Sequence, residues 1–122
     1  MQRDCGDILD RASIAKLKIE RINLGENKEE WEAFEKELTL LENKYHNIPI
    51  KMFFNLLLNI NTMIWNLESD LRQGKLDGVL SEVGRRAIEI REHNNLRVQA
   101  KNIINKLVGE GFQDLKKDHI SE

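Results

Sequence analysis

Four polar residues recur at helical spacing near the C-terminal end of the chain: Asn94, Arg97, Lys101 and Asn105. Their separations of three, four and four residues place all four on one side of a helix. An arginine and a lysine one helical turn apart, with amides on both sides, suit a phosphate or a carboxylate. The segment therefore predicts a binding site for a small anionic ligand.

These polar residues interrupt an apolar pattern. Leu76, Leu80, Val83, Ala87 and Ile90 begin a three-four rhythm that continues through Asn94, Arg97 and Lys101 before it reaches Ile104. Buried charged side chains are normally paired or bound to a ligand. The cations of this segment therefore need partners on another helix.

Candidate partners lie on two earlier segments. Asn61 and Glu68 break an apolar stripe of the segment around 50–72, Trp65 lies beside them, and Arg72 follows one turn later. Asp10 flanks the apolar arc of the first segment. We expect a cleft between the first, third and fourth helices. There, Arg97 and Lys101 bind the anion, Glu68 and Asp10 orient these cations, and Trp65 forms an apolar wall. Asn61, Asn94 and Asn105 complete the hydrogen bonding.

Two structural interpretations compete with this binding site. In the first, Glu68 pairs with Arg97 or Lys101 and Asn61 pairs with Asn94, so that the polar residues only fix the helix register. In the second, the last helix turns another apolar stripe toward the core and leaves the polar stripe in solvent. That second stripe comprises Leu96, Ala100, Ile103 and Leu107.

The apolar periodicity predicts an all-α fold, an antiparallel bundle of about four main helices in a single domain over 1–122. The expected helices cover about 7–24, with Asp7 as N-cap and Gly25 as stop; 27–46; the segment from Pro49 to about 72; and a long last helix from between 77 and 81 to 107 or 108. An irregular tail is expected over 109–122, and no strand pattern or internal repeat is present.

The length of the last helix bears on the partners of the chain. A helix of this length spans roughly 40 Å. Because this exceeds the length of the first two helices, we expect a second copy to cover the excess in a homodimer. The net charge of −2 gives no electrostatic reason to expect nucleic acid, and no apolar run is long enough for a bilayer.

The location and cofactors follow from the same composition. The N-terminal residues do not resemble a signal peptide, and one cysteine permits neither an internal disulfide nor a zinc motif. The histidines are not spaced as metal ligands. We expect a cytoplasmic protein with no metal or organic cofactor.

Three segments resemble a family of small uncharacterised all-helical bacterial and phage proteins. They are GDILDRASIAKLKIERI at 6–22, NINTMIWNLESDLR at 59–72 and NNLRVQAKNIIN at 94–105. The matching polar positions are Asp10, Lys18, Asn61, Trp65, Glu68, Arg72, Asn94, Arg97, Lys101 and Asn105. Ala15 and Asn95 depart from the pattern, which tends to have Leu and Asp there. The resemblance implies no activity; it implies only that these polar positions belong to one shared pattern.

These observations favour a ligand-binding or protein-interaction module, and whether there is any catalysis stays open because no nucleophile motif is present. The alternative is an all-α, magnesium-dependent nucleotide pyrophosphohydrolase, with Glu29, Glu30 and Glu32 joined by Glu68 and Asp70 as metal ligands. A more remote option is a chorismate-mutase-like enzyme that uses Arg21, Arg97 and Lys101.

Overall fold

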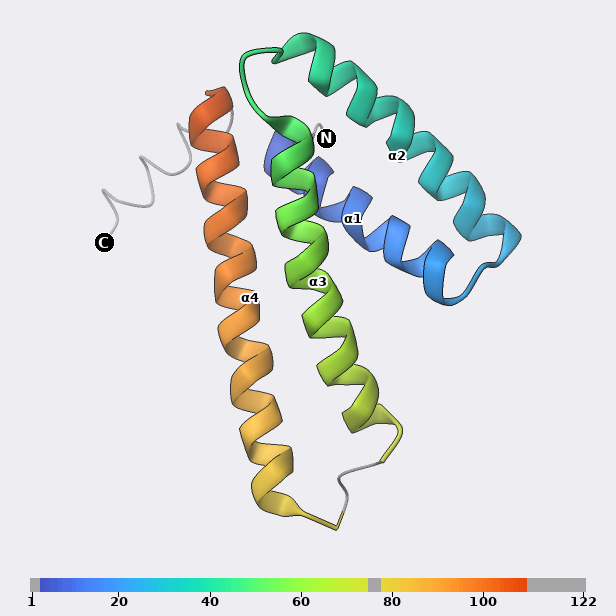
Figure 1. Cartoon of the computed structure of the whole chain (residues 1–122), viewed down its shortest axis with the longest axis vertical. Coiled ribbons are helices and arrows are strands. Elements are labelled where there is room, and N and C mark those ends of the chain that lie inside the picture. The colour runs from blue at the N-terminus through green and yellow to red at the C-terminus, as the bar shows by residue number, and fades with distance from the viewer. Residues whose placement is uncertain (1–2, 75–77, 110–122) are drawn as a thin grey trace.

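The computed structural model describes residues 3–74 and 78–109 of the chain. Within these residues the fold is all-α and consists of four helices (Figure 1): α1 (Cys5–Arg21), α2 (Gly25–Lys44), α3 (Ile50–Arg72) and α4 (Leu80–Val108). No strand is present in these ranges. The prediction of a four-helix, all-α bundle with a long last helix is therefore confirmed.

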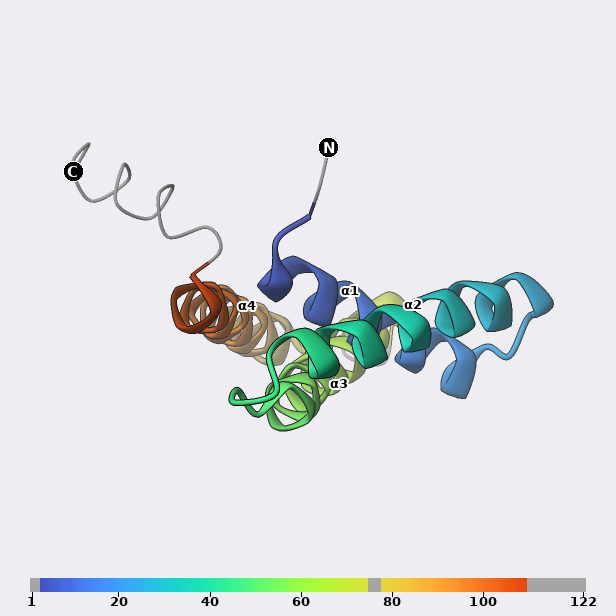
Figure 2. The ribbon, with the colours of Figure 1, turned by 90° about the horizontal axis from the view of Figure 1, so that it is seen from above.

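The helices form two antiparallel pairs. α1 and α2 make one hairpin, α3 and α4 make the other, and α1 packs against all three other helices. Seen from above, α1 and α2 lie on one side of the α3–α4 pair (Figure 2). α1 therefore connects the two hairpins, and its contacts determine how they are held together.

The core lies where α1 crosses α3 and α4. Buried apolar side chains come from all four helices and form one cluster with Leu9, Ala12, Leu57 and Ile104 at its centre. Apolar side chains of α2 pack against this cluster but are only partly buried, apart from Leu41. The described part of the chain contains no helix that is both long and apolar enough to cross a membrane.

The boundaries of the first two helices differ from those predicted. The N-cap of α1 is Asp4, whose carboxylate accepts a hydrogen bond from the Asp7 N–H at 2.8 Å, so Asp7 lies inside the helix. The first helix ends before the expected stop at Gly25, and Asn23 adopts the left-handed conformation there, with φ of 51°. Asparagine tolerates this conformation better than other residues with a side chain. Gly25 is therefore free to begin α2.

The ends of α3 and α4 agree with the sequence. α3 ends at Arg72 as expected, with Pro49 as its N-cap residue. α4 ends at Val108, where Gly109 closes the helix in the left-handed conformation with φ of 81°. The tail expected over 109–122 lies outside the described residues from 110 onward, and the homodimer stays a prediction.

Gly6 marks the closest approach of α1 to α4. A Cβ atom on Gly6 would lie 2.6 Å from the Lys101 carbonyl oxygen and 3.0 Å from the Asn105 Oδ1. Both atoms belong to α4, and the carbonyl is part of a helix backbone, so it cannot rotate away. Only glycine therefore allows this contact.

Gly6→Ala is expected to destabilise the protein by about 1–3 kcal/mol, the usual range for overpacking. The free energy of unfolding from urea denaturation measures this loss. Gly84→Ala is the matched control, since Gly84 is exposed inside α4 with nothing near its Cβ position. That change is expected to stabilise by about 0.5–1 kcal/mol, because alanine favours a helix over glycine. Equal effects of the two substitutions would contradict the close contact at Gly6.

Candidate functional site: a polar cluster between α1, α3 and α4

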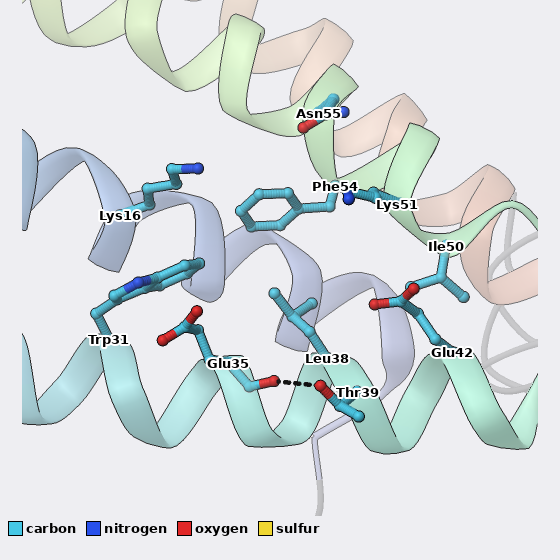
Figure 3. Close-up of a pocket in the computed structure, with 10 residues that line it drawn as sticks. All are labelled: Lys16, Trp31, Glu35, Leu38, Thr39, Glu42, Ile50, Lys51, Phe54 and Asn55. Carbon is cyan, nitrogen blue, oxygen red and sulfur yellow. Dashed lines mark hydrogen bonds between the residues drawn. The ribbon is translucent and has the colours of Figure 1, made fainter.

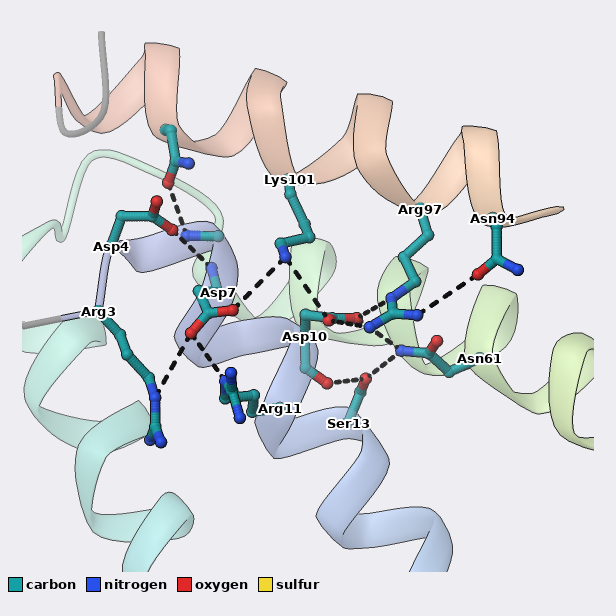
Figure 4. A network of polar contacts seen from close by, with 12 residues as sticks. Arg3, Asp4, Asp7, Asp10, Arg11, Ser13, Asn61, Asn94, Arg97 and Lys101 are labelled. Atoms are coloured by element: carbon teal, nitrogen blue, oxygen red, sulfur yellow. Dashed lines mark hydrogen bonds and ion pairs between the residues drawn. The ribbon is translucent and has the colours of Figure 1, made fainter. Parts of the chain in front are cut away.

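The centre of the cluster is the pair formed by Asp10 and Arg97 (Figure 4). Arg97 Nε donates to Asp10 Oδ1 at 2.9 Å, and Arg97 Nη2 donates to Asp10 Oδ2 at 2.8 Å. Asp10 is 1% exposed, whereas Arg97 is partly buried. A guanidinium group that donates two parallel bonds to one carboxylate makes a strong and directional contact. This pair joins α1 to α4 across 87 residues of sequence.

α3 contributes to the same carboxylate through Asn61. Its Nδ2 donates to Asp10 Oδ1 at 2.9 Å and to Ser13 Oγ at 2.7 Å. The Ser13 hydroxyl donates in turn to the Asp10 carbonyl oxygen at 2.6 Å. All three side chains are buried, and these bonds supply the partners that buried polar groups require. Three helices therefore meet at one carboxylate.

The electrostatics of the cluster favour its charged state. The hydrogen bond to Asp10 is the main reason that the pKa of Arg97 lies above its ordinary value, although partial burial opposes this shift. Burial raises the pKa of Asp7, but the hydrogen bond and charge of Arg11, together with Lys101, outweigh burial and lower it overall. Lys101 Nζ lies 3.5 Å from Asp7 Oδ1 and 3.9 Å from Asp10 Oδ2. Each cation from α4 is therefore balanced by a carboxylate from α1.

Asn105 and Asn94 occupy the two ends of the polar stripe. Asn105 Oδ1 accepts a hydrogen bond of 2.7 Å from the Gly6 N–H. The first N–H groups of a helix have no partner within the helix, so Asn105 satisfies one of these groups in α1. Asn94 Oδ1 accepts from Arg97 Nη1 at 3.4 Å and supports the guanidinium from the same helix.

The predicted residues thus separate into two groups. The structure brings Asp10, Asn61, Asn94, Arg97, Lys101 and Asn105 together. The remaining three lie further along α3. Glu68 and Trp65 are partly buried and Arg72 is exposed at the helix end. Glu68 acts on Arg97 only as a distant charge that favours the protonated guanidinium.

Both structural interpretations of the polar stripe need correction. The carboxylate that pairs with Arg97 and Lys101 is Asp10 instead of Glu68, and Asn61 bonds to α1 instead of Asn94. The interpretation that turns the stripe of Leu96, Ala100, Ile103 and Leu107 toward the core is wrong, because only Ala100 is buried and the other three are about half exposed. The reason is that α1 lies over the polar stripe and leaves the opposite side of α4 uncovered.

Gly6, Asp7 and Ser13 also belong to the cluster, although they were not predicted from the sequence. Asp7, Asp10 and Ser13 follow one another at intervals of three, which places them along one side of α1. This spacing was a usable signal. Gly6 left no signal, because its role depends on the backbone of α4.

Residues of the described ranges line two further cavities away from the cluster. The first, of about 250 Å³, lies between α1, α2 and α3 (Figure 3), with Trp31 and Phe54 as its aromatic wall. Lys16 lies over both rings, with Nζ 5.7 Å and 5.9 Å from their centroids. The cavity is smaller than typical ligand pockets of about 300–1,000 Å³. The charges of its two lysines and two glutamates sum to zero, so the lining favours neither an anionic nor a cationic ligand.

The second cavity, of about 220 Å³, carries more positive charge. Its lining includes Arg3, Arg11 and Lys18 but only one carboxylate, Glu30. These cations are at least 40% exposed and already bonded: both arginines contact Asp7, and Lys18 lies 3.6 Å from Glu30. Solvent screens such exposed charges, so they hold an anion weakly.

The magnesium-site alternative finds no support in the geometry. Glu29, Glu30 and Glu32 are exposed on α2. Within 3–74 and 78–109, no three histidine, cysteine, aspartate or glutamate residues lie close enough together to hold a metal ion.

Comparison with known proteins finds no matching family model, no matching curated protein and no matching solved structure. The resemblance to the family of small helical proteins therefore stays a hypothesis.

Arg97→Met is expected to destabilise the protein by about 3–5 kcal/mol, because it leaves a buried carboxylate without its main partner. Urea denaturation measures the loss. Arg85→Met removes an exposed ion pair with Glu82 and Glu89, and is expected to lose less than about 1 kcal/mol. Asp10→Asn combined with Arg97→Met tests the pair directly. If the two losses simply add, the proposed coupling between these side chains is wrong.

Stability is expected to fall in acid partly through Asp7. Its folded pKa lies below the ordinary value of 3.8, so its contribution is present above pH 3.8 and is lost as the pH falls through the folded pKa. Asp7→Asn should therefore be less stable than the wild type near neutral pH, with a difference that shrinks as the pH falls below 3.8 and through the folded pKa. Urea denaturation at several pH values measures this difference. A gap independent of pH would show that the charge of Asp7 is not the stabilising feature.

Proposed function

We propose that this protein is a helical protein-interaction module whose polar cluster holds the helices together and whose exposed α3–α4 surface binds a helical partner. The observation that carries this proposal is the occupation of the Arg97 guanidinium by Asp10. An external anion would have to displace a carboxylate that is 1% exposed and leave it unpaired inside the protein. This favours an internal connection over a ligand site.

The partner surface is supported by the exposed apolar residues. Three from α3 (Met52, Leu56 and Met63) and three from α4 (Leu96, Ile103 and Leu107) are between 44% and 58% exposed. Apolar residues repeating at intervals of three, four or seven on a helix are a common way to bind another helix. We also place the module in the cytoplasm, because its single cysteine fits a reducing compartment.

A photoreactive amino acid at Leu96 tests the interaction function. Cross-linking in the native host is expected to give one defined adduct from this position. The control position is Glu32 on the exposed, charged side of α2, where no defined adduct is expected. Identical patterns from the two positions would overturn the proposal.

Titration with phosphate, pyrophosphate and citrate tests the competing anion function. Thermal unfolding of the wild type should show no saturable rise in Tm that depends on Lys101, because Asp7 and Asp10 already neutralise the cations. The control is Lys101→Gln, which keeps a polar side chain at this position. A saturable rise in the wild type that this variant loses would establish an anion site.

A further inference from the structure

The exposed surface of α3 and α4 has an unusual composition for this chain. One third of all residues are charged, yet every exposed residue of α3 from 52 to 66 and of α4 from 95 to 103 is uncharged. These residues are Met52, Asn55, Leu56, Asn59, Met63 and Asn66 of α3, and Asn95, Leu96, Val98, Gln99, Asn102 and Ile103 of α4. Asn55 also lines the cavity against α2, and Asn66 accepts a hydrogen bond from Arg21, so these two lie where the surface adjoins α1 and α2. Depletion of charge is the compositional mark of the core of a protein interface.

The same comparison on α2 gives the opposite result. Its exposed charged residues are Glu26, Lys28, Glu29, Glu30, Glu32, Glu35, Lys36, Glu37, Glu42 and Lys44. α2 therefore has the surface of a solvated helix. Among the four described helices, only the α3–α4 pair combines exposed apolar residues with missing charges over several turns.

Asn59 and Gln99 define the middle of this surface. Asn61 and Arg97 bond to the same carboxylate of Asp10, so these two residues lie at one level of the antiparallel pair. Because α3 and α4 are antiparallel, two residues back along α3, to Asn59, and two residues forward along α4, to Gln99, again reach one level. Two residues turn a helix by about 200°, which places both side chains on the side opposite α1. In Figure 2 this side of the pair is not covered by α1 or α2.

The residues around this level are arranged symmetrically. On α4, Leu96 and Ile103 lie three residues before and four residues after Gln99; on α3, Leu56 and Met63 lie at the same offsets from Asn59. The residues two turns from Gln99 in each direction along α4 are exposed and oppositely charged. They are Glu92, seven residues before Gln99, and Lys106, seven residues after it.

From this pattern, and resting on the proposed interaction function, we infer that the α3–α4 surface binds the same surface of a second copy of this chain. The two copies are related by a twofold axis perpendicular to the helices at the level of Asn59 and Gln99. α4 then packs antiparallel on α4 of the second copy, and α3 on α3. Each Glu92 meets Lys106 of the second copy, and each Leu96 meets Ile103.

The charges also select this arrangement over the other symmetric one. A twofold axis parallel to the helices would place α4 against α3 of the second copy at equal levels. Glu92 would then face the level of Asn66, where Arg21 Nη1 donates to Asn66 Oδ1 at 3.0 Å, but Lys106 would face the level of Met52 and would gain no carboxylate. The perpendicular axis forms two identical ion pairs, each between Glu92 of one copy and Lys106 of the other. Opposite charges across an interface determine its register and orientation.

The available area is adequate for a stable dimer. Two helices about 35 Å long that lie side by side present a face of roughly 700 Å². A standard interface buries about 800 Å² on each partner. The product, two helical hairpins face to face, is a four-helix bundle, which is a common way to bury such surfaces.

Charge reversal tests both the dimer and its orientation. Sedimentation equilibrium of the full chain is expected to show a dimer for the wild type. Glu92→Lys and Lys106→Glu are each expected to weaken it by about tenfold or more, because each change creates two repulsive contacts by symmetry. The double variant that exchanges both charges is expected to return to within about threefold of the wild type. Glu32→Lys and Lys36→Glu on α2 are matched controls and should change nothing.

Gln99→Cys supplies a second measurement that does not depend on affinity. A residue next to the axis lies near its own copy, so mild oxidation should give a disulfide-linked dimer. Cys5 is buried and does not compete. Thr39→Cys, exposed on α2, is the control and should stay monomeric in denaturing electrophoresis.

Several results would overturn the inference. These are a monomeric wild type, a dimer that tolerates both single reversals, and a double exchange that fails to restore binding. The adduct at Leu96 separates this inference from the interaction function. If Leu96 cross-links to a different protein and the chain is monomeric in solution, the homodimer is wrong but the proposed interaction function is supported. If Leu96 gives no defined adduct and the chain is monomeric in solution, both the homodimer and the proposed interaction function are wrong.

Discussion

The two bonds that Arg97 donates to Asp10 are the contact on which the rest of the structure depends. Without them, α1 would carry a buried carboxylate into the junction of three helices, which is strongly unfavourable. With them, the carboxylate has a single position in which Arg97 and Asn61 both reach it. Hydrophobic packing can slide by a turn at moderate loss of free energy, whereas a buried ion pair cannot. The pair therefore determines the register of α1 on the α3–α4 hairpin.

The close approach at Gly6 is a consequence of the same register. Asp10 can reach Arg97 only when the first turn of α1 lies against the last turns of α4. There Asn105 satisfies the Gly6 N–H, and the Lys101 carbonyl leaves no room for a side chain. The polar stripe of α4 is thus a continuous contact, with Asn105 at one end and Arg97 with Asn94 at the other. Its parts support one another because they share one helix–helix crossing.

α4 has three different surroundings, and this explains its weak amphipathic pattern. One side faces α3 through Ala100 and Ile104, a second carries the polar stripe toward α1, and a third is exposed with Leu96 and Ile103. The periodicity correctly indicated two competing apolar stripes. It could not rank them, because α1 covers the polar side and only the packing of α1 decides which stripe is buried.

The sequence by itself determined the four helices and the polar stripe, because side chains on one helix face are related by local spacing alone. It also named Asp10 and Asn61 among the candidate partners, although it placed Glu68 beside Asp10 and one interpretation gave Glu68 the pairing that Asp10 makes. Tertiary structure decided what those residues do. Whether Arg97 is open to a ligand or occupied depends on which carboxylate reaches it across 87 residues of chain. That distance is fixed only when α1 crosses α4, and no periodicity within one helix reports the angle or level of such a crossing.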